Sequence, residues 1–239
     1  MTPADLQAID EERREREDEL LLLLLLLLAR SVELNDNLAT FDGSLLRQHG
    51  AGEIAQTMAD AHADGARFYA GRPSLSRAEL VRQYEPAAQE MVDAMVLAIL
   101  ATGQPSLGDA LVDVRYTRSD STGLRLGAER QVTTAGNAGL VDGFAARFGT
   151  VAAFRHVSVV DDRTTDICRG RHNLTLAVTN PYWLTNWPSL HWNCRSIVEP
   201  LGRGAVLTER VPSLPSPEAG FGIAPASVVR IVRGARRSA

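Results

Sequence analysis

Apolar residues recur every three to four positions through most of the first 150 residues, which is the spacing of helices that bury one face. Turn formers and caps divide this region into four predicted helices, over residues 10–34, 53–69, 76–100 and 126–148. The third helix begins with a capping box formed by Ser76 and Glu79, and Pro86 is expected to kink or restart it. This part of the chain is therefore predicted to be mainly helical.

The first predicted helix has two halves of different character. Its N-terminal half carries opposite charges four residues apart, such as Glu12 with Arg16, which stabilise a solvated helix. Its second half is leucine from residue 20 to residue 28, and is therefore apolar on every face. Such a helix is buried on all sides, either at the centre of a monomeric bundle or against a neighbouring subunit. The run is too short for the ~20 apolar residues of a membrane span, so none is predicted.

Three glycines lie inside the fourth predicted helix, namely Gly136, Gly139 and Gly143. Glycine lowers the intrinsic stability of a helix, so its repeated use needs a separate reason. We expect another backbone to approach this helix closely at the three positions.

The pattern changes to short β-branched segments after residue 150. Residues 154–160 predict a strand, and residues 195–198 predict its partner, which Pro200 ends. A further short strand is expected at residues 112–116, within a polar loop that spans residues 108–123.

Together these elements predict an α+β protein, with a mostly helical N-terminal region followed by a small module with short antiparallel strands. Four regions are expected: a charged and leucine-rich helical arm (1–50), a helical region (51–124), the strand-containing module (125–200) and an extended Pro/Gly-rich tail that ends in arginines (201–239).

The composition is that of an ordinary globular protein, and it narrows the function classes only slightly. The net charge of −4 argues against a general affinity for nucleic acid or acidic membranes, and all basic residues are arginine. Two cysteines are too few for a secreted disulfide scaffold, and acidic residues precede the leucine run where a signal peptide would have basic ones. We therefore expect a protein made in the cytoplasm.

The rarest chemical groups of the chain gather between residues 161 and 195. Two thiols and two imidazoles form the short-spaced pairs Cys168/His172 and His191/Cys194, a ligand set that suits a structural zinc ion. The alternatives are ordinary buried thiols, a disulfide between the two cysteines, and a Cys–His nucleophile–base pair.

Charged residues stand where the predicted strand ends. Asp161, Asp162 and Arg163 are interpreted as bracing groups that pair with each other or, for Arg163, with Asp166, and Arg195 is expected to brace the loop from the second strand. The other interpretation is acid–base machinery formed by the two aspartates. The three tryptophans, at positions 183, 187 and 192, are expected to form the core of the module rather than a binding face.

The order and spacing of these residues resemble the C-terminal signature of phage Mu F-like minor head proteins, also called phage head morphogenesis proteins. The shared features are listed in chain order: Asn137-Ala138-Gly139, Asp161-Asp162-Arg163-Thr164, Cys168, Pro188, His191 and Cys194-Arg195. The resemblance covers roughly residues 125–200. Thr165 stands where the family often has the first cysteine of a pair, so His172 would have to replace that ligand; His156, Asn173 and Thr134 also depart from the usual residues.

The resemblance implies a structural role without catalysis. Such proteins bind the portal at one capsid vertex, are assembled into the head in the host cytoplasm, and support head assembly or DNA packaging and delivery. The leucine helix would then contact the portal or a sister copy, and the terminal arginines would contact packaged DNA; these are Arg230, Arg233, Arg236 and Arg237. No small-molecule substrate is implied. The alternative function is a metal-dependent hydrolase or nuclease that uses Asp161, Asp162 and His191.

Overall fold

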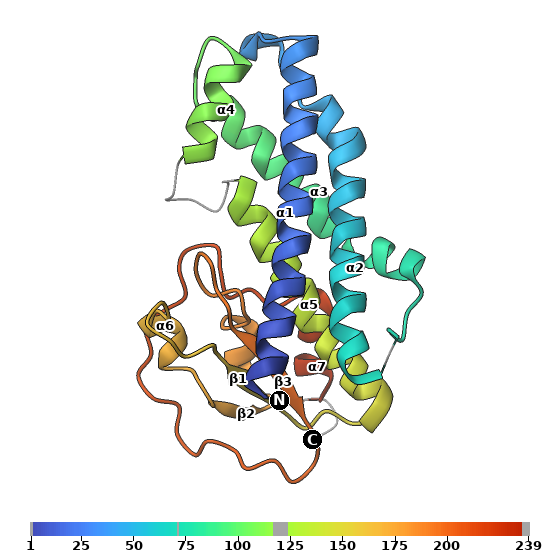
Figure 1. The fold of residues 1–239 in the computed structure, drawn as a ribbon, viewed down its shortest axis with the longest axis vertical. Helices are drawn as coiled ribbons and strands as arrows, with labels where there is room; N and C mark the ends of the chain where they lie inside the picture. Colours follow the sequence, from blue (N-terminus) through green and yellow to red (C-terminus); the bar gives the residue numbers. More distant parts are fainter. Residues whose placement is uncertain (1, 71, 117–123, 236–239) are drawn as a thin grey trace.

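A computed structural model describes residues 2–70, 72–116 and 124–235 of the chain. Long helices form a bundle, and a small antiparallel sheet with its loops lies at one end of that bundle (Figure 1). The predicted α+β class is therefore confirmed. No helix in the described part of the chain is both long enough and apolar enough to cross a bilayer.

The leucine-rich helix α1 (Pro3–Leu34) starts earlier than predicted, because Thr2 and Asp5 form a capping box at its N-terminus. Leu20, Leu24 and Leu28 are at most 1% exposed and pack into the bundle. On the opposite face Leu22 and Leu26 are 59% and 62% exposed. Burial on every side, as expected from the sequence, is therefore wrong for the single chain, which buries one stripe of the helix.

The remaining bundle consists of α2 (Ala51–Ala70), α3 (Arg77–Ala101), α4 (Leu107–Tyr116) and α5 (Leu124–Phe148). A 3-10 turn (Leu38–Thr40) and a π-helical turn (Leu46–Gly50) connect α1 to α2. The capping box at Ser76 starts α3 as predicted, whereas Pro86 lies inside one continuous helix.

Helices α2 and α5 pack backbone to backbone at glycines, which confirms the predicted close approach at Gly139 and Gly143, whereas a Cβ atom on Gly136 would make an ordinary contact at 3.7 Å. A Cβ atom on Gly139 would lie 2.0 Å from the carbonyl oxygen of His62, and one on Gly143 would lie 2.3 Å from that of Ala66. Gly65 of α2 is equally constrained by the Gly136 carbonyl oxygen. The absence of side chains at these positions is what allows the two helices to meet.

The strand predicted at residues 112–116 is wrong, since these residues belong to α4. The helix is started by Ser106, whose hydroxyl accepts the backbone N–H of Asp109, and by the Asp36 carboxylate, which accepts that of Gly108. Leu107 and Ala110 then bury one face of the helix in the core. The rest of the predicted loop, residues 117–123, lies outside the described residues.

The sheet has the order β2-β1-β3, and both pairings are antiparallel. Its strands are β1 (Ala153–Val157), β2 (Thr175–Ala177) and β3 (Ile197–Leu201). The predicted pairing of the first and last strands is confirmed, with Phe154 opposite Pro200. Pro200 lies inside β3 rather than beyond its end, which an edge strand tolerates because its outer N–H groups are not needed for the ladder.

Aromatic side chains fill the core of the sheet module. Trp183, in a 3-10 turn (Pro181–Leu184), and Trp187 are completely buried, and both meet the ring of Phe154 edge to face at centroid distances of 5.4 and 5.5 Å. The predicted core role of the tryptophans thus holds for these two, whereas Trp192 is only partly buried.

The extended tail predicted after residue 201 is wrong at its end, where residues Ala226–Ala235 form helix α7. Val228 and Val232, one turn apart, are buried in the same core as Trp183 and Trp187. Their burial explains the helix, because an amphipathic segment is stabilised mainly by the core that its apolar face meets.

Candidate functional site

The turn after β1 is joined to the segment before β3 by a bidentate ion pair. Arg195 donates from Nη1 to Asp161 Oδ2 at 2.7 Å and from Nη2 to Oδ1 at 2.6 Å. This hydrogen bonding lowers the pKa of Asp161 well below its usual range. The backbone N–H of Arg163 also donates to Asp161, at 3.0 Å. These contacts are the arrangement expected of bracing groups.

Two other charged residues of the turn, Asp162 and Arg163, were also predicted to brace it. Asp162 and the side chain of Arg163 are exposed, and neither is part of an ion pair among the described residues. Arg169 braces the turn instead, since its Nη2 donates to the carbonyl oxygens of Asp161 and Thr164 at 2.8 and 3.1 Å. Nothing in the sequence distinguished Arg169 from other surface arginines.

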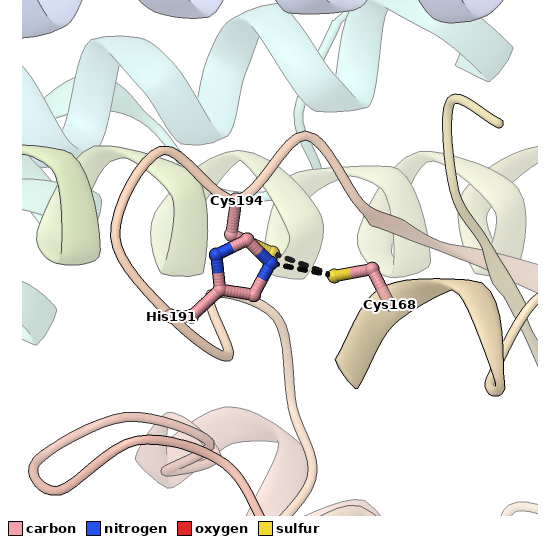
Figure 2. A group of neighbouring side chains, drawn as sticks. All are labelled: Cys168, His191 and Cys194. Atoms are coloured by element: carbon pink, nitrogen blue, oxygen red, sulfur yellow. Dashed lines mark hydrogen bonds between the residues drawn. The ribbon is translucent and has the colours of Figure 1, made fainter. Parts of the chain in front are cut away.

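Two cysteines and one histidine meet beside this ion pair. Cys168 lies on the short helix α6 (Asp166–Arg169), and His191 and Cys194 lie on the loop that leads into β3 (Figure 2). Cys168 Sγ is 2.9 Å from His191 Nε2 and 3.6 Å from Cys194 Sγ. All three residues are buried, and their three donor atoms lie within 4.8 Å of one another. We call these residues the thiol–imidazole cluster.

His172, the fourth residue of the predicted ligand set, is not part of the thiol–imidazole cluster. Its Nδ1 instead accepts the backbone N–H of Ser158 at 3.2 Å. Thr165 lies beside the cluster instead, with its Oγ1 2.9 Å from His191 Nε2. Thr165 is also the N-cap of α6, which fixes its place relative to Cys168.

The cluster residues are oriented as metal ligands would be. The Nδ1 of His191 is 2.7 Å from the carbonyl oxygen of Trp192, which can only accept, so Nδ1 carries the hydrogen and Nε2 points at the thiols. Ser196 Oγ donates to Cys168 Sγ at 3.0 Å. Two soft sulfur donors and one imidazole nitrogen are a donor set that zinc accepts, so the residues present fit such an ion.

Electrostatics shift the pKa values of the two thiols in opposite directions. The hydrogen bond to Cys194 and burial raise the pKa of Cys168. Burial alone would raise the pKa of Cys194 as well, but the hydrogen bond from Cys168 and the interaction with His191 outweigh it and place that pKa well below the usual thiol value. The lowered pKa of Cys194 favours the anionic form of sulfur, which is the form that binds metals.

Two buried polar side chains of helix α5 hold the backbone of the loop and strand next to the cluster. Glu129 Oε1 accepts the backbone N–H of Cys194 at 2.9 Å. Asn137 Oδ1 accepts the N–H of Val198 at 2.7 Å, so it satisfies the outer edge of β3. The sequence pointed to Asn137 only through its shared motif, and it did not point to Glu129, because a helical glutamate is ordinarily solvated.

Arg171 ties the site to the segment beyond β3, and sequence reasoning missed it too. It is 1% exposed, and it donates to the carbonyl oxygens of Ile167 and Pro215 at 2.6 and 2.7 Å and to Asn186 Oδ1 at 2.8 Å. Nothing in its sequence context marks it as buried, since arginine is rarely found in a core.

These features define a class of protein: an α+β chain in which a helical bundle supports a small sheet module, closed by an Asp–Arg pair and a thiol–imidazole cluster. The family described as Phage Mu protein F like protein matches residues 52–199, which is more than half of the chain, and the chain belongs to this family of phage head morphogenesis proteins. The match begins before residue 125, so it includes α2 and α3. No curated protein and no solved structure matches the chain.

Membership in a family of structural head proteins gives no support to the hydrolase alternative. The residues named for that function are also divided in the structure. Asp161 is paired with Arg195, and Asp162 is exposed, whereas His191 faces the two thiols.

Proposed function

We propose that this head morphogenesis protein is a minor capsid component that binds the portal at one vertex of the virion and supports head assembly or DNA packaging and delivery. The observation that carries the proposal is the family match over residues 52–199. The exposed leucine stripe, which consists of Leu22 and Leu26 on α1, supplies a surface for the portal, because apolar side chains left in water gain free energy when a partner covers them.

Replacing both residues of the leucine stripe by glutamate (Leu22→Glu with Leu26→Glu) is expected to weaken binding to co-expressed portal protein at least tenfold. Each substitution removes the roughly 1.5–3 kcal/mol of binding free energy that burial of a leucine side chain contributes, and about 1.4 kcal/mol corresponds to a tenfold change in affinity. Binding is measured by co-purification of the two proteins and by titration. Circular dichroism should be unchanged, since both side chains are exposed in the single chain.

The matched control is Val206→Glu with Leu207→Glu, which adds the same charges to exposed apolar positions after β3 and should leave portal binding intact. Unchanged portal binding by the leucine-stripe variant would contradict the assignment of this surface. A change in self-association with portal binding intact would assign the stripe to sister copies instead.

We also propose that α7 contacts packaged DNA. Arg230 and Arg233 are exposed and lie opposite Val228 and Val232, so the helix presents its basic face away from the core. Arg236 and Arg237, the other predicted contacts, lie outside the described residues. Arginines on such a face neutralise phosphates and release counterions.

Replacing Arg230 and Arg233 by glutamine should weaken DNA binding and flatten its dependence on salt. Two lost phosphate contacts reduce the slope of log affinity against log salt concentration by about 1.8. The measurement is fluorescence anisotropy of duplex DNA at several salt concentrations. Arg203→Gln with Arg210→Gln removes the same charge from exposed positions elsewhere and should leave the slope unchanged; equal slopes in all three proteins would exclude α7 as the contact.

Finally, we propose that Cys168, His191 and Cys194 hold a structural zinc ion. When bound, the ion would link α6 to the loop before β3, a loop with little regular structure of its own. The chain prepares this link with its own contacts, since Glu129 holds the Cys194 backbone and the Trp192 carbonyl oxygen sets the tautomer of His191.

A further inference from the structure

We propose that the thiol–imidazole cluster is a three-ligand metal site whose fourth coordination position is open to a small anion from solvent. This inference rests on the proposed metal role and adds to it. Most structural zinc sites surround the ion with four protein ligands, whereas here the ion would join α6 and the loop before β3 through three protein ligands and keep one exchangeable ligand.

The described residues supply three donors and no fourth. His172 is held by the backbone N–H of Ser158 and lies outside the cluster. His156, on β1, is fully buried and its ring nitrogens have no hydrogen-bond partner, yet it also lies outside the group whose donors are within 4.8 Å of one another. Thr165 is near enough, but a neutral hydroxyl is not among the usual zinc ligands.

Space for a fourth donor exists on the Thr165 side of the cluster. A cavity of about 10 Å³ is lined by Cys168 and His191 together with Thr165, Arg163 and Asn193. That volume is about what one water-sized group requires. The last three residues are exposed, so the cavity opens to solvent. On the other side the Cys194 backbone is sealed by Glu129, which is 3% exposed.

The charge around this cavity favours an anion. Metal binding would convert Cys168 to a thiolate as well, so the two sulfurs would balance the charge of a divalent ion, and any attraction for an anion must come from the side chains around the cavity. Arg195 also lines the cavity, but its guanidinium already forms an ion pair with Asp161. Arg163 has no ion pair within the described ranges, so its guanidinium remains to attract a small anion. Thr165, once its hydroxyl is released from His191 Nε2, would be placed to donate a hydrogen bond to that anion.

The test uses cobalt(II) in place of zinc, because its visible absorption bands report the number and kind of ligands. The purified full chain is loaded with cobalt and titrated with thiocyanate, a small anion that coordinates metals. We expect saturable changes in the cobalt bands as thiocyanate displaces a solvent molecule. Arg163→Gln should weaken the apparent thiocyanate affinity about two- to fivefold, which is the effect of one partly solvated charge.

A substitution that closes the site provides the decisive comparison. Thr165→Cys places a third sulfur at the open position, so the sulfur-to-cobalt charge-transfer absorption should rise and the response to thiocyanate should disappear. His172→Asn and His156→Phe, with folding checked by circular dichroism, should leave the cobalt bands and the thiocyanate response as in the unchanged chain.

Each contrary result has a distinct meaning. Cobalt bands that do not respond to thiocyanate would overturn the open position and leave the metal proposal standing. Bands that are lost in a folded His172→Asn or His156→Phe variant would show that the protein itself supplies the fourth ligand, and would likewise overturn it. Failure to bind either cobalt or zinc would overturn the metal proposal together with this inference.

Discussion

Gly139→Ala is expected to lower the free energy of unfolding by about 3 kcal/mol, because overpacking a close helix contact costs more than the helix propensity of alanine returns. The new Cβ atom would lie 2.0 Å from the carbonyl oxygen of His62 and 2.8 Å from its carbonyl carbon. Both atoms belong to the α2 backbone, so the helices must separate. Thermal unfolding measures the effect, and the expected decrease in Tm is roughly 10 °C.

Gly136→Ala is the matched control in the same helix. Its Cβ atom would be 3.7 Å from the Ala61 carbonyl oxygen, an ordinary contact. Alanine should therefore stabilise the helix by about 0.5–1 kcal/mol. If the two variants unfolded at the same temperature, the close approach of α2 and α5 would not require glycine at position 139.

Stability should fall between pH 5 and pH 8 through the titration of Glu17, by about 3 kcal/mol. Burial raises the pKa of this α1 carboxyl from 4.5 to about 7, although Arg13 Nε lies 3.3 Å away and lowers it in part. The Thr133 hydroxyl donates to the same carboxylate at 3.3 Å. A folded-state pKa above the unfolded value means that folding is favoured with the proton bound. The contribution is thus complete below pH 4.5 and is lost as the pH rises through 7.

Glu17→Gln isolates this contribution, because glutamine keeps the shape of the protonated acid and does not titrate. The variant should match the unchanged chain near pH 4.5 and exceed it by about 3 kcal/mol at pH 8 in urea denaturation. Glu19→Gln, on the same helix with a side chain that is 65% exposed, should leave the pH profile as it is. If the free energy of unfolding of Glu17→Gln changed with pH in parallel to that of the unchanged chain, ionisation of Glu17 would not destabilise the fold.

Local signals in the sequence predicted most of the elements. The capping box at Ser76 and the glycines of α5 follow from interactions between residues close in sequence or from simple steric rules. The first and last strands lie far apart in the chain, but the β-branched pattern of these short segments was enough to predict that they pair. Prediction was wrong where a distant partner decides the conformation. Residues 112–116 become helical in part because Asp36, 72 residues away, accepts the N–H of Gly108 at the start of α4, and α7 forms because Val228 and Val232 meet the core of the sheet module. The Ser106 cap of α4 is a local signal that the prediction missed.

The candidate site shows the same division. Its residue types were visible in the sequence, and so was their grouping between residues 161 and 195. Which of them meet was not visible: Cys168 joins His191 and Cys194 across 23 and 26 residues, whereas His172, four residues from Cys168, does not. The conformation of the loops decides which residues meet, and the spacing of residues in the sequence does not specify that conformation.

By itself the amino-acid sequence determined most of the helices, two of the strands, the family resemblance and the chemical groups available, since these depend on periodicity, caps and residue identity. Only the tertiary structure decided which leucines of α1 are covered and which residues surround the cysteines. A run of leucines has no periodicity that could select a buried face, so the neighbouring helices select it. Likewise, the thiols and the imidazole come together because contacts between distant segments, such as that of Glu129 of α5 with the Cys194 backbone, fix the loop that carries His191 and Cys194 beside α6.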